Sequence, residues 1–166
     1  MYYKSNEINL YDILRRLPDA VAVMRGNQAN GKIHGTVKFY QVARGVLIVA
    51  DILGLPSSDE QCKNNIFAFH IHSGSSCSGN EDDPFADAGT HYNPNECPHP
   101  YHAGDMPPLF GAGGRAFLAF LTDRFTVDEV IDKTVIIHKS PDDFTTQPSG
   151  NAGNKIACGI ISKVKR

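Results

Sequence analysis

The 166-residue sequence predicts an all-β sandwich or barrel, and three observations lead to this class. Several short apolar runs are separated by turn residues, and one of them, residues 33–40, alternates apolar and polar side chains at period two. The 15 glycines and 10 prolines suit a turn-rich β protein better than a helical bundle. Apolar residues make up 41% of the chain and charged residues 20%, which is the balance of a globular domain.

Size and charge exclude several classes of protein. A mass of 18.1 kDa fits one domain with one core. The net charge of −2 offers no basic face for nucleic acid, and a chain without tryptophan has little to stack on bases. No apolar run reaches the roughly 18–20 residues of a membrane span. We therefore expect neither a nucleic-acid partner nor a membrane partner.

Residues 1–18 form an N-terminal extension. They contain no early Lys/Arg cluster followed by an unbroken apolar stretch, so they do not look like a secretion signal. Their apolar residues suit a short amphipathic helix instead: Ile8, Leu10, Tyr11, Ile13, Leu14 and Leu17. We therefore expect a cytoplasmic protein, with an extracellular location as the alternative if the chain is a processed form.

The expected strands fall into two sets along the chain. The first set occupies residues 20–24, 33–40, 45–50 and 66–72, and the second set occupies residues 115–121, 134–138 and 156–163. Residues 128–131 suit a single helical turn. The sequence shows no internal repeat and no linker, which favours one domain.

Between these two sets, residues 73–114 follow neither the helical nor the strand period. A loop of this length is unusual in a compact domain unless something anchors it. A bound metal ion or a crosslink can supply that order. The segment contains candidate anchors of both kinds: His91, His99, His102, Asp105, Cys77 and Cys97.

Two histidines lie two positions apart on the expected strand 66–72. Because side chains alternate across a strand, His70 and His72 share one face, and the other face carries Phe67, Phe69 and Ile71. If the apolar face packs on the core, both rings point outward and can bind one metal ion. His138 ends strand 134–138 and can point outward in the same way. By itself the pair is a weak signal, since histidine pairs without a metal are common.

A second cluster of possible ligands lies in the long loop. His91, His99, His102 and Asp105 follow one another at gaps of eight, three and three residues. Three imidazoles and one carboxylate form a closed tetrahedral set of the kind that binds structural zinc. The alternative is a chance cluster of histidines in a polar loop. His34 stands apart on strand 33–40, and we expect it to face solvent.

In these segments the chain resembles the copper/zinc superoxide dismutases. The resemblance runs from about residue 20 to residue 161. Residues 69–72 (FHIH) look like the family's first copper pair, and residues 89–94 (GTHYNP) look like its G-x-H-[FY]-N-P segment. Further matches are His99, residues 102–105 (HAGD), residues 135–138 (VIIH) and residues 150–159 (GNAGNKIACG).

The resemblance implies an eight-stranded Greek-key sandwich or flattened barrel over residues 19–166, with long metal-binding and channel loops. It implies an antioxidant oxidoreductase that converts superoxide to O2 and hydrogen peroxide by Cu(II)/Cu(I) cycling beside a structural zinc. The copper ligands that it implies are His70, His72, His91 and His138. The implied zinc ligands are His91, His99, His102 and Asp105, so that His91 bridges the two metals.

The resemblance also implies roles for residues outside the ligand sets. It gives catalytic roles to His91 and Lys155. Asp142 matches a carboxylate that hydrogen-bonds one copper histidine and one zinc histidine and so fixes their ring directions. Cys77 and Cys158 match an intrachain disulfide. Cys62 and Cys97 have no counterpart, and they are either free or bonded to each other.

Two departures from the family bear on activity. Lys155 stands where the family has an arginine beside the copper, so a planar pair of donors is lost. Residues 144–154 carry no charge, and Ser149 replaces a threonine. We therefore expect an enzyme slower than typical members. One alternative is a non-catalytic zinc-binding domain, which these departures favour and against which the complete copper set argues. The other is a metal buffer, which would share the same ligands and differ only in its rate of metal exchange. The sequence allows a homodimer but does not demand one.

Overall fold

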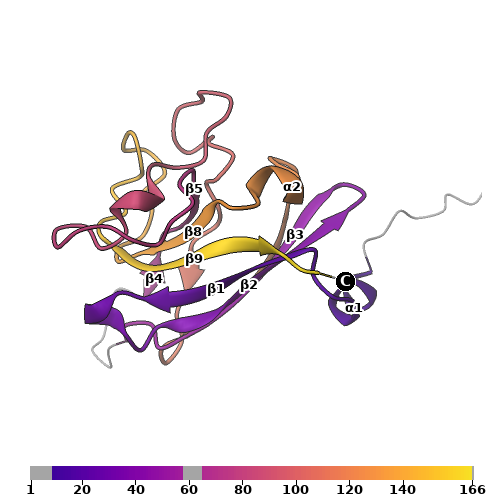
Figure 1. The fold of residues 1–166 in the computed structure, drawn as a ribbon, viewed down its shortest axis with the longest axis horizontal. Helices are drawn as coiled ribbons and strands as arrows, with labels where there is room; N and C mark the ends of the chain where they lie inside the picture. Colours follow the sequence, from indigo (N-terminus) through magenta and orange to yellow (C-terminus); the bar gives the residue numbers. More distant parts are fainter. Residues whose placement is uncertain (1–8, 58–64, 166) are drawn as a thin grey trace, which may run out of the picture.

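The computed structural model describes residues 9–57 and 65–165. A seven-stranded antiparallel sheet curls into a half-barrel (Figure 1). Its strand order is β5 (Phe69–His72), β8 (Thr134–His138), β9 (Lys155–Lys163), β1 (Ala20–Gly26), β2 (His34–Val42), β3 (Gly45–Leu53) and β7 (Arg115–Thr122). A second, two-stranded sheet pairs β4 (Ile66–Phe67) with β6 (Leu109–Phe110). The predicted all-β class is confirmed.

Every stretch expected to form a strand does so. The stretch 66–72 is split into β4 and β5 at Ala68, whose backbone bonds instead to Ser140 and His138. Counted as one, these two strands bring the number among the described residues to eight, as the family resemblance implied. Only β6 has no counterpart in the sequence prediction, because two residues are too few to show an alternation.

The alternation of side chains decides which face of the sheet packs on the core. On β1, Ala20, Ala22 and Met24 are buried in the main hydrophobic cluster. Phe67, Phe69 and Ile71 belong to the same cluster, as predicted. Because neighbouring side chains on a strand point to opposite faces, His70 and His72 lie on the outer side of β5. The packing of the core therefore fixes where the histidines stand.

The helix α1 (Leu10–Arg15) lies within the N-terminal extension, where a short helix was expected. Asn9 caps it, and Ile13 packs on the outer side of β2 and β3 against Tyr40, Leu47 and Val49. Its other large apolar side chains stay exposed: Leu10, Tyr11 and Leu14. No helix among the described residues is both long and apolar enough to cross a membrane.

The other helical segments are short. The α2 turn (Val127–Val130) lies where a single turn was expected, and a capping box formed by Thr126 and Glu129 starts it. Two 3₁₀ turns, η1 (Gln28–Asn30) and η2 (Ala86–Ala88), lie in the loops. The loops 73–108 and 139–154 gather beside β5, β8 and β9 (Figure 1).

A disulfide between Cys77 and Cys158 ties the long loop to β9, with a Cα–Cα distance of 5.7 Å. This is the pairing that the family resemblance implied. Phe85, Ala88 and Ile136 pack around it in a small buried cluster. Cys97 is a free cysteine, and Cys62 lies outside the described residues.

The disulfide spans 81 residues of sequence, so it restricts the unfolded chain strongly. We expect the double variant Cys77→Ser/Cys158→Ser to lose about 4–5 kcal/mol of unfolding free energy in the chain-entropy picture. Urea denaturation under non-reducing conditions measures this loss. The matched control, Cys97→Ser, removes a free thiol and should change stability by less than about 0.5 kcal/mol. A double variant as stable as this control would contradict the expected role.

Candidate metal centre

Four histidines converge on the outer side of the sheet where β5 and β8 pair. His70 and His72 come from β5, and His138 ends β8 where the register with β9 shifts. His91 comes from the long loop and forms an isolated β-bridge with His72. One ligand atom from each side chain lies within 4.8 Å of the others. We call these residues the first ligand group: His70, His72, His91 and His138.

His91 also belongs to a second ligand group, which contains His99, His102 and Asp105. The Asp105 carboxylate lies at its centre, with one oxygen 2.7 Å from His91 Nδ1. Its other oxygen lies 3.0 Å from His99 Nδ1 and 3.3 Å from His102 Nδ1. The structure thus brings together all the residues predicted to bind metals, and His91 stands between the two groups.

The hydrogen bonds of the first ligand group leave nitrogen atoms available for a metal. Three rings already donate from one nitrogen: His70 to Asp142 at 2.8 Å, His72 to the Gly89 carbonyl at 2.8 Å, and His138 to the Gly153 carbonyl at 3.0 Å. In a neutral imidazole the other nitrogen is then an unprotonated acceptor. Among the described residues, His70 Nδ1 and His91 Nε2 are buried without a hydrogen-bond partner. Such unpaired nitrogens fit a copper ion, which imidazole ligands suit.

Asp142 connects the two ligand groups. Its two oxygens lie 2.8 Å from His70 Nε2 and 2.8 Å from His99 Nε2, and it also accepts from the Phe144 amide at 2.7 Å. Gly150 packs so closely that a β-carbon there would stand 1.9 Å from Asp142 Oδ1. The backbone of Gly150 has φ +68°, which glycine adopts readily. The carboxylate is therefore held by both its partners and its surroundings.

The electrostatics of the site favour metal-binding forms of these side chains. Burial lowers the pKa of His70, lowers that of His72 strongly, and lowers that of His138 to about 3. Burial alone would raise the pKa of Asp142, but hydrogen bonds from His70, the Phe144 amide and His99 outweigh it and lower the pKa to about 2. At neutral pH the three histidines are neutral and Asp142 is charged, as metal binding requires.

Two side chains outside the ligand groups fasten the loop that carries the second group. One Arg124 nitrogen lies 3.1–3.2 Å from the carbonyl oxygens of Pro100, His102 and Asp105. The Gln147 side chain both accepts from the His99 amide at 3.0 Å and donates to the His99 carbonyl at 2.7 Å. Sequence reasoning missed both residues, because their partners are backbone atoms that leave no pattern in the sequence.

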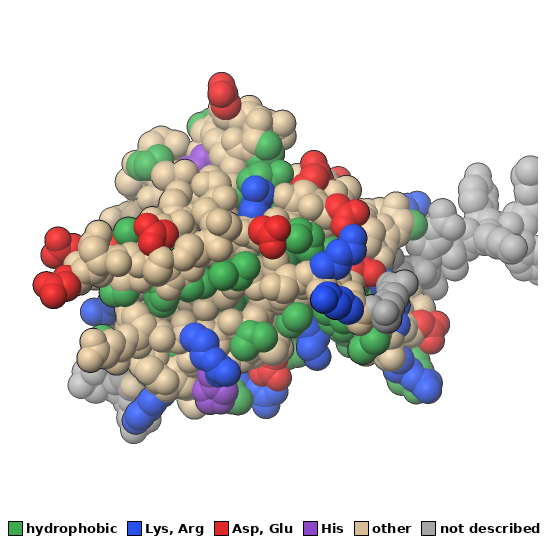
Figure 2. All heavy atoms as spheres, in the orientation of Figure 1, with side chains coloured by type: hydrophobic (Ala, Val, Ile, Leu, Met, Phe, Trp, Pro, Cys, Tyr) green, Lys and Arg blue, Asp and Glu red, His purple; other side chains and the backbone are tan. Residues whose placement is uncertain are grey.

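A cavity of about 870 Å³ opens beside the first ligand group. His72, His91 and His138 line it together with Lys139 and Lys155. Lys155 therefore stands in the same cavity as three of the four histidines. The sequence reasoning had not considered Lys139, although it directly follows His138. The acidic segment 81–83 also lines the cavity, and Figure 2 shows acidic side chains on the loop that projects at the left.

Comparisons with known proteins agree with this geometry. The family profile described as copper/zinc superoxide dismutase matches residues 33–161. A Cu-Zn superoxide dismutase from Legionella pneumophila is 33% identical over 135 residues, which cover 76% of this chain and 76% of that protein. One from Aquifex aeolicus is 31% identical over 146 residues, or 79% of this chain and 80% of that protein. A solved double mutant of an SOD-like protein from Bacillus subtilis matches with a TM-score of 0.68 and 28% identity, over 84% of this chain and 95% of that chain.

The Gln147 contact predicts a defect in metal binding. Replacing Gln147 by alanine removes both hydrogen bonds to the His99 backbone, so zinc affinity should fall about 10-fold, in the range seen when residues that orient metal ligands are lost. Competition with a chromophoric chelator measures the affinity. Ser149→Ala, in the same loop, is the matched control and should leave it unchanged. Equal affinities for the two variants would show that Gln147 does not position His99.

The lowered histidine pKa values predict acid sensitivity of the metal-free protein. In the unfolded chain these histidines bind protons below the ordinary value of 6.5, whereas in the folded protein they resist protonation, down to about pH 3 for His138. The unfolded state then binds more protons, so stability falls as the pH drops through this window. Urea denaturation of the metal-free protein between about pH 8 and about pH 5 tests this. Stability that stays level or rises toward pH 5 would contradict it.

Proposed function

This chain belongs to the copper/zinc superoxide dismutase family, and we propose that it converts two superoxide anions and two protons into O2 and hydrogen peroxide. The observation that carries the proposal is the pair of complete ligand groups that share His91. In the proposed assignment, His70, His72, His91 and His138 hold copper. His91, His99, His102 and Asp105 hold zinc.

When bound, copper would supply the one-electron redox chemistry of the reaction between Cu(II) and Cu(I), and zinc, which has no redox chemistry, would not take part in it. The chain's own residues bind and orient these ions. Asp142 and the carbonyls of Gly89 and Gly153 fix the ring directions of His70, His72 and His138. These rings are almost completely buried, and the cavity opens beside His72 and His138.

His91 has a further role in proton transfer. Its Nδ1 faces the Asp105 carboxylate of the second ligand group, and its Nε2 is buried without a hydrogen-bond partner in the described part of the chain. If each nitrogen binds one metal, the ring carries no proton. We propose that Nε2, when it is not bound to a metal, would take a proton from solvent, hold it between the two half-reactions and then give it to the peroxide product. The second proton comes from solvent through the cavity.

The completeness of the first ligand group favours this proposal over a zinc-binding domain without copper. All four of its histidines are buried, and their pairing partners leave nitrogens free for a second metal. A domain that binds zinc alone has no use for His72 or His138, whose burial as uncharged polar groups costs stability. A metal buffer would share the ligands but would not need a cavity beside them.

Substitution of the shared histidine tests the assignment. We expect His91→Ala to lose both copper and zinc stoichiometry and more than about 100-fold in dismutation rate, because it removes a ligand from both groups. His102→Ala should mainly weaken zinc. Metal analysis after reconstitution, paired with a stopped-flow dismutation assay, measures both effects, and His34→Ala is the control outside the site. Full occupancy of both metals in His91→Ala would refute the shared ligand.

A further inference from the structure

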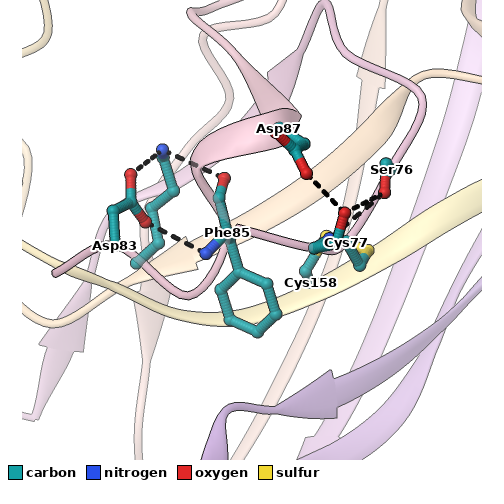
Figure 3. Close-up of a disulfide and its surroundings, with 8 residues drawn as sticks. Ser76, Cys77, Asp83, Phe85, Asp87 and Cys158 are labelled. Carbon is teal, nitrogen blue, oxygen red and sulfur yellow. Dashed lines mark hydrogen bonds and ion pairs between the residues drawn. A yellow bond between two sulfur atoms is a disulfide. The ribbon is translucent and has the colours of Figure 1, made fainter. Parts of the chain in front are cut away.

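Lys155 is paired with an acidic side chain from the long loop. Its ammonium lies 2.6 Å from Asp83 Oδ2 and 3.2 Å from the Phe85 carbonyl (Figure 3). The other Asp83 oxygen accepts from the Phe85 amide at 3.1 Å. Both oxygens of the carboxylate and two donor positions of the ammonium are therefore engaged. The sequence gives no sign of this pair, because its members are 72 residues apart.

The surrounding structure holds this ion pair in place. Phe85 is buried and packs with Ile136 and Cys158. The disulfide fastens the loop to β9 three residues beyond Lys155, so the segment 77–85 is attached to β9 at both ends (Figure 3). The Lys155 side chain is only 14% exposed, whereas that of Asp83 is 39% exposed. An ammonium so enclosed has little freedom to turn toward another anion.

Other charged residues of the cavity are not paired in this way. Asp82 and Lys139 both line the cavity. Within residues 9–57 and 65–165, neither side chain forms a hydrogen bond or ion pair. Lys139 is thus a free cation of the cavity, and Asp82 provides a carboxylate of the same charge as Asp83 without the contact to Lys155.

Resting on the proposed function, we propose that Asp83 weakens the binding of small anions in the cavity, superoxide among them, by occupying Lys155. The carboxylate subtracts one unit of positive charge from the cavity and engages the donors that an anion would use. Lys139 then becomes the cation available to an entering anion. This adds a third reason for a slow rate, beside the replacement of arginine by Lys155 and the uncharged segment 144–154.

The first test needs no bound metal. In wild-type protein, Lys155 should react with acetic anhydride more slowly than Lys139, as quantified by mass spectrometry of the digest. Asp83→Asn removes the charged partner and should raise the relative reactivity of Lys155 about three-fold or more, the scale of one partly exposed ion pair. Asp82→Asn changes the net charge equally and should leave this ratio unaltered. Unchanged Lys155 reactivity in Asp83→Asn, or an equal rise in Asp82→Asn, would overturn the proposal.

The second test measures anion binding in copper-reconstituted protein, with azide as the probe. Asp83→Asn should tighten azide binding roughly five-fold, as expected for one charge acting over about 8 Å at an effective dielectric constant of about 40. Asp82→Asn should have a smaller effect, and adding Lys155→Gln to Asp83→Asn should abolish most of the gain. Equal effects of the two aspartate variants would overturn the proposal.

The two tests separate this inference from the proposed function. If the Asp83 variant shows both expected shifts and yet neither it nor the wild type dismutes superoxide, the proposed function fails while the role of Asp83 in anion binding stands. If the wild type dismutes superoxide and the two aspartate variants behave alike in both tests, the proposed function stands and the role of Asp83 is refuted.

Discussion

The Asp142 carboxylate holds the metal centre together, because it contacts one histidine from each ligand group. A buried carboxylate is costly unless charged or polar partners surround it, and here His70, His99 and the Phe144 amide fill that role. Gly150 closes over the carboxylate because it has no side chain. The ring directions of His70 and His99 and the position of the Phe144 amide after β8 all depend on this one side chain.

The loops around the centre are held by contacts that need no metal. Arg124 and Gln147 bind the backbone of the loop 99–105 from two separate segments, and the disulfide holds the preceding segment on β9. These contacts restrict the loops independently of any metal ion, so they reduce the ordering entropy that opposes metal binding. The burial of the uncharged histidines lowers the stability of the folded protein, and binding of the metal ions offsets this loss.

The parts of the structure that repeat a simple period could be predicted from sequence. Alternation on residues 66–72 placed His70 and His72 outside the core, and the spacing of the loop histidines indicated a second set of ligands. The roles of Gln147 and Asp83 could not be predicted, since each depends on a contact between segments far apart in the chain. The exposed apolar side chains of α1 also departed from the amphipathic pattern, because only Ile13 reaches the sheet.

The strand order also bears on the synthesis of the protein. In the sheet, β9 lies between β8 and β1, although it follows both in the chain. A chain that ended before β9 could pair these strands only as two separate pieces, β1–β2–β3–β7 and β5–β8, and this would expose the facing edges of β1 and β8. Such edges favour association with other chains. The last strand to be synthesised, β9, pairs with both β1 and β8 and so covers these two edges.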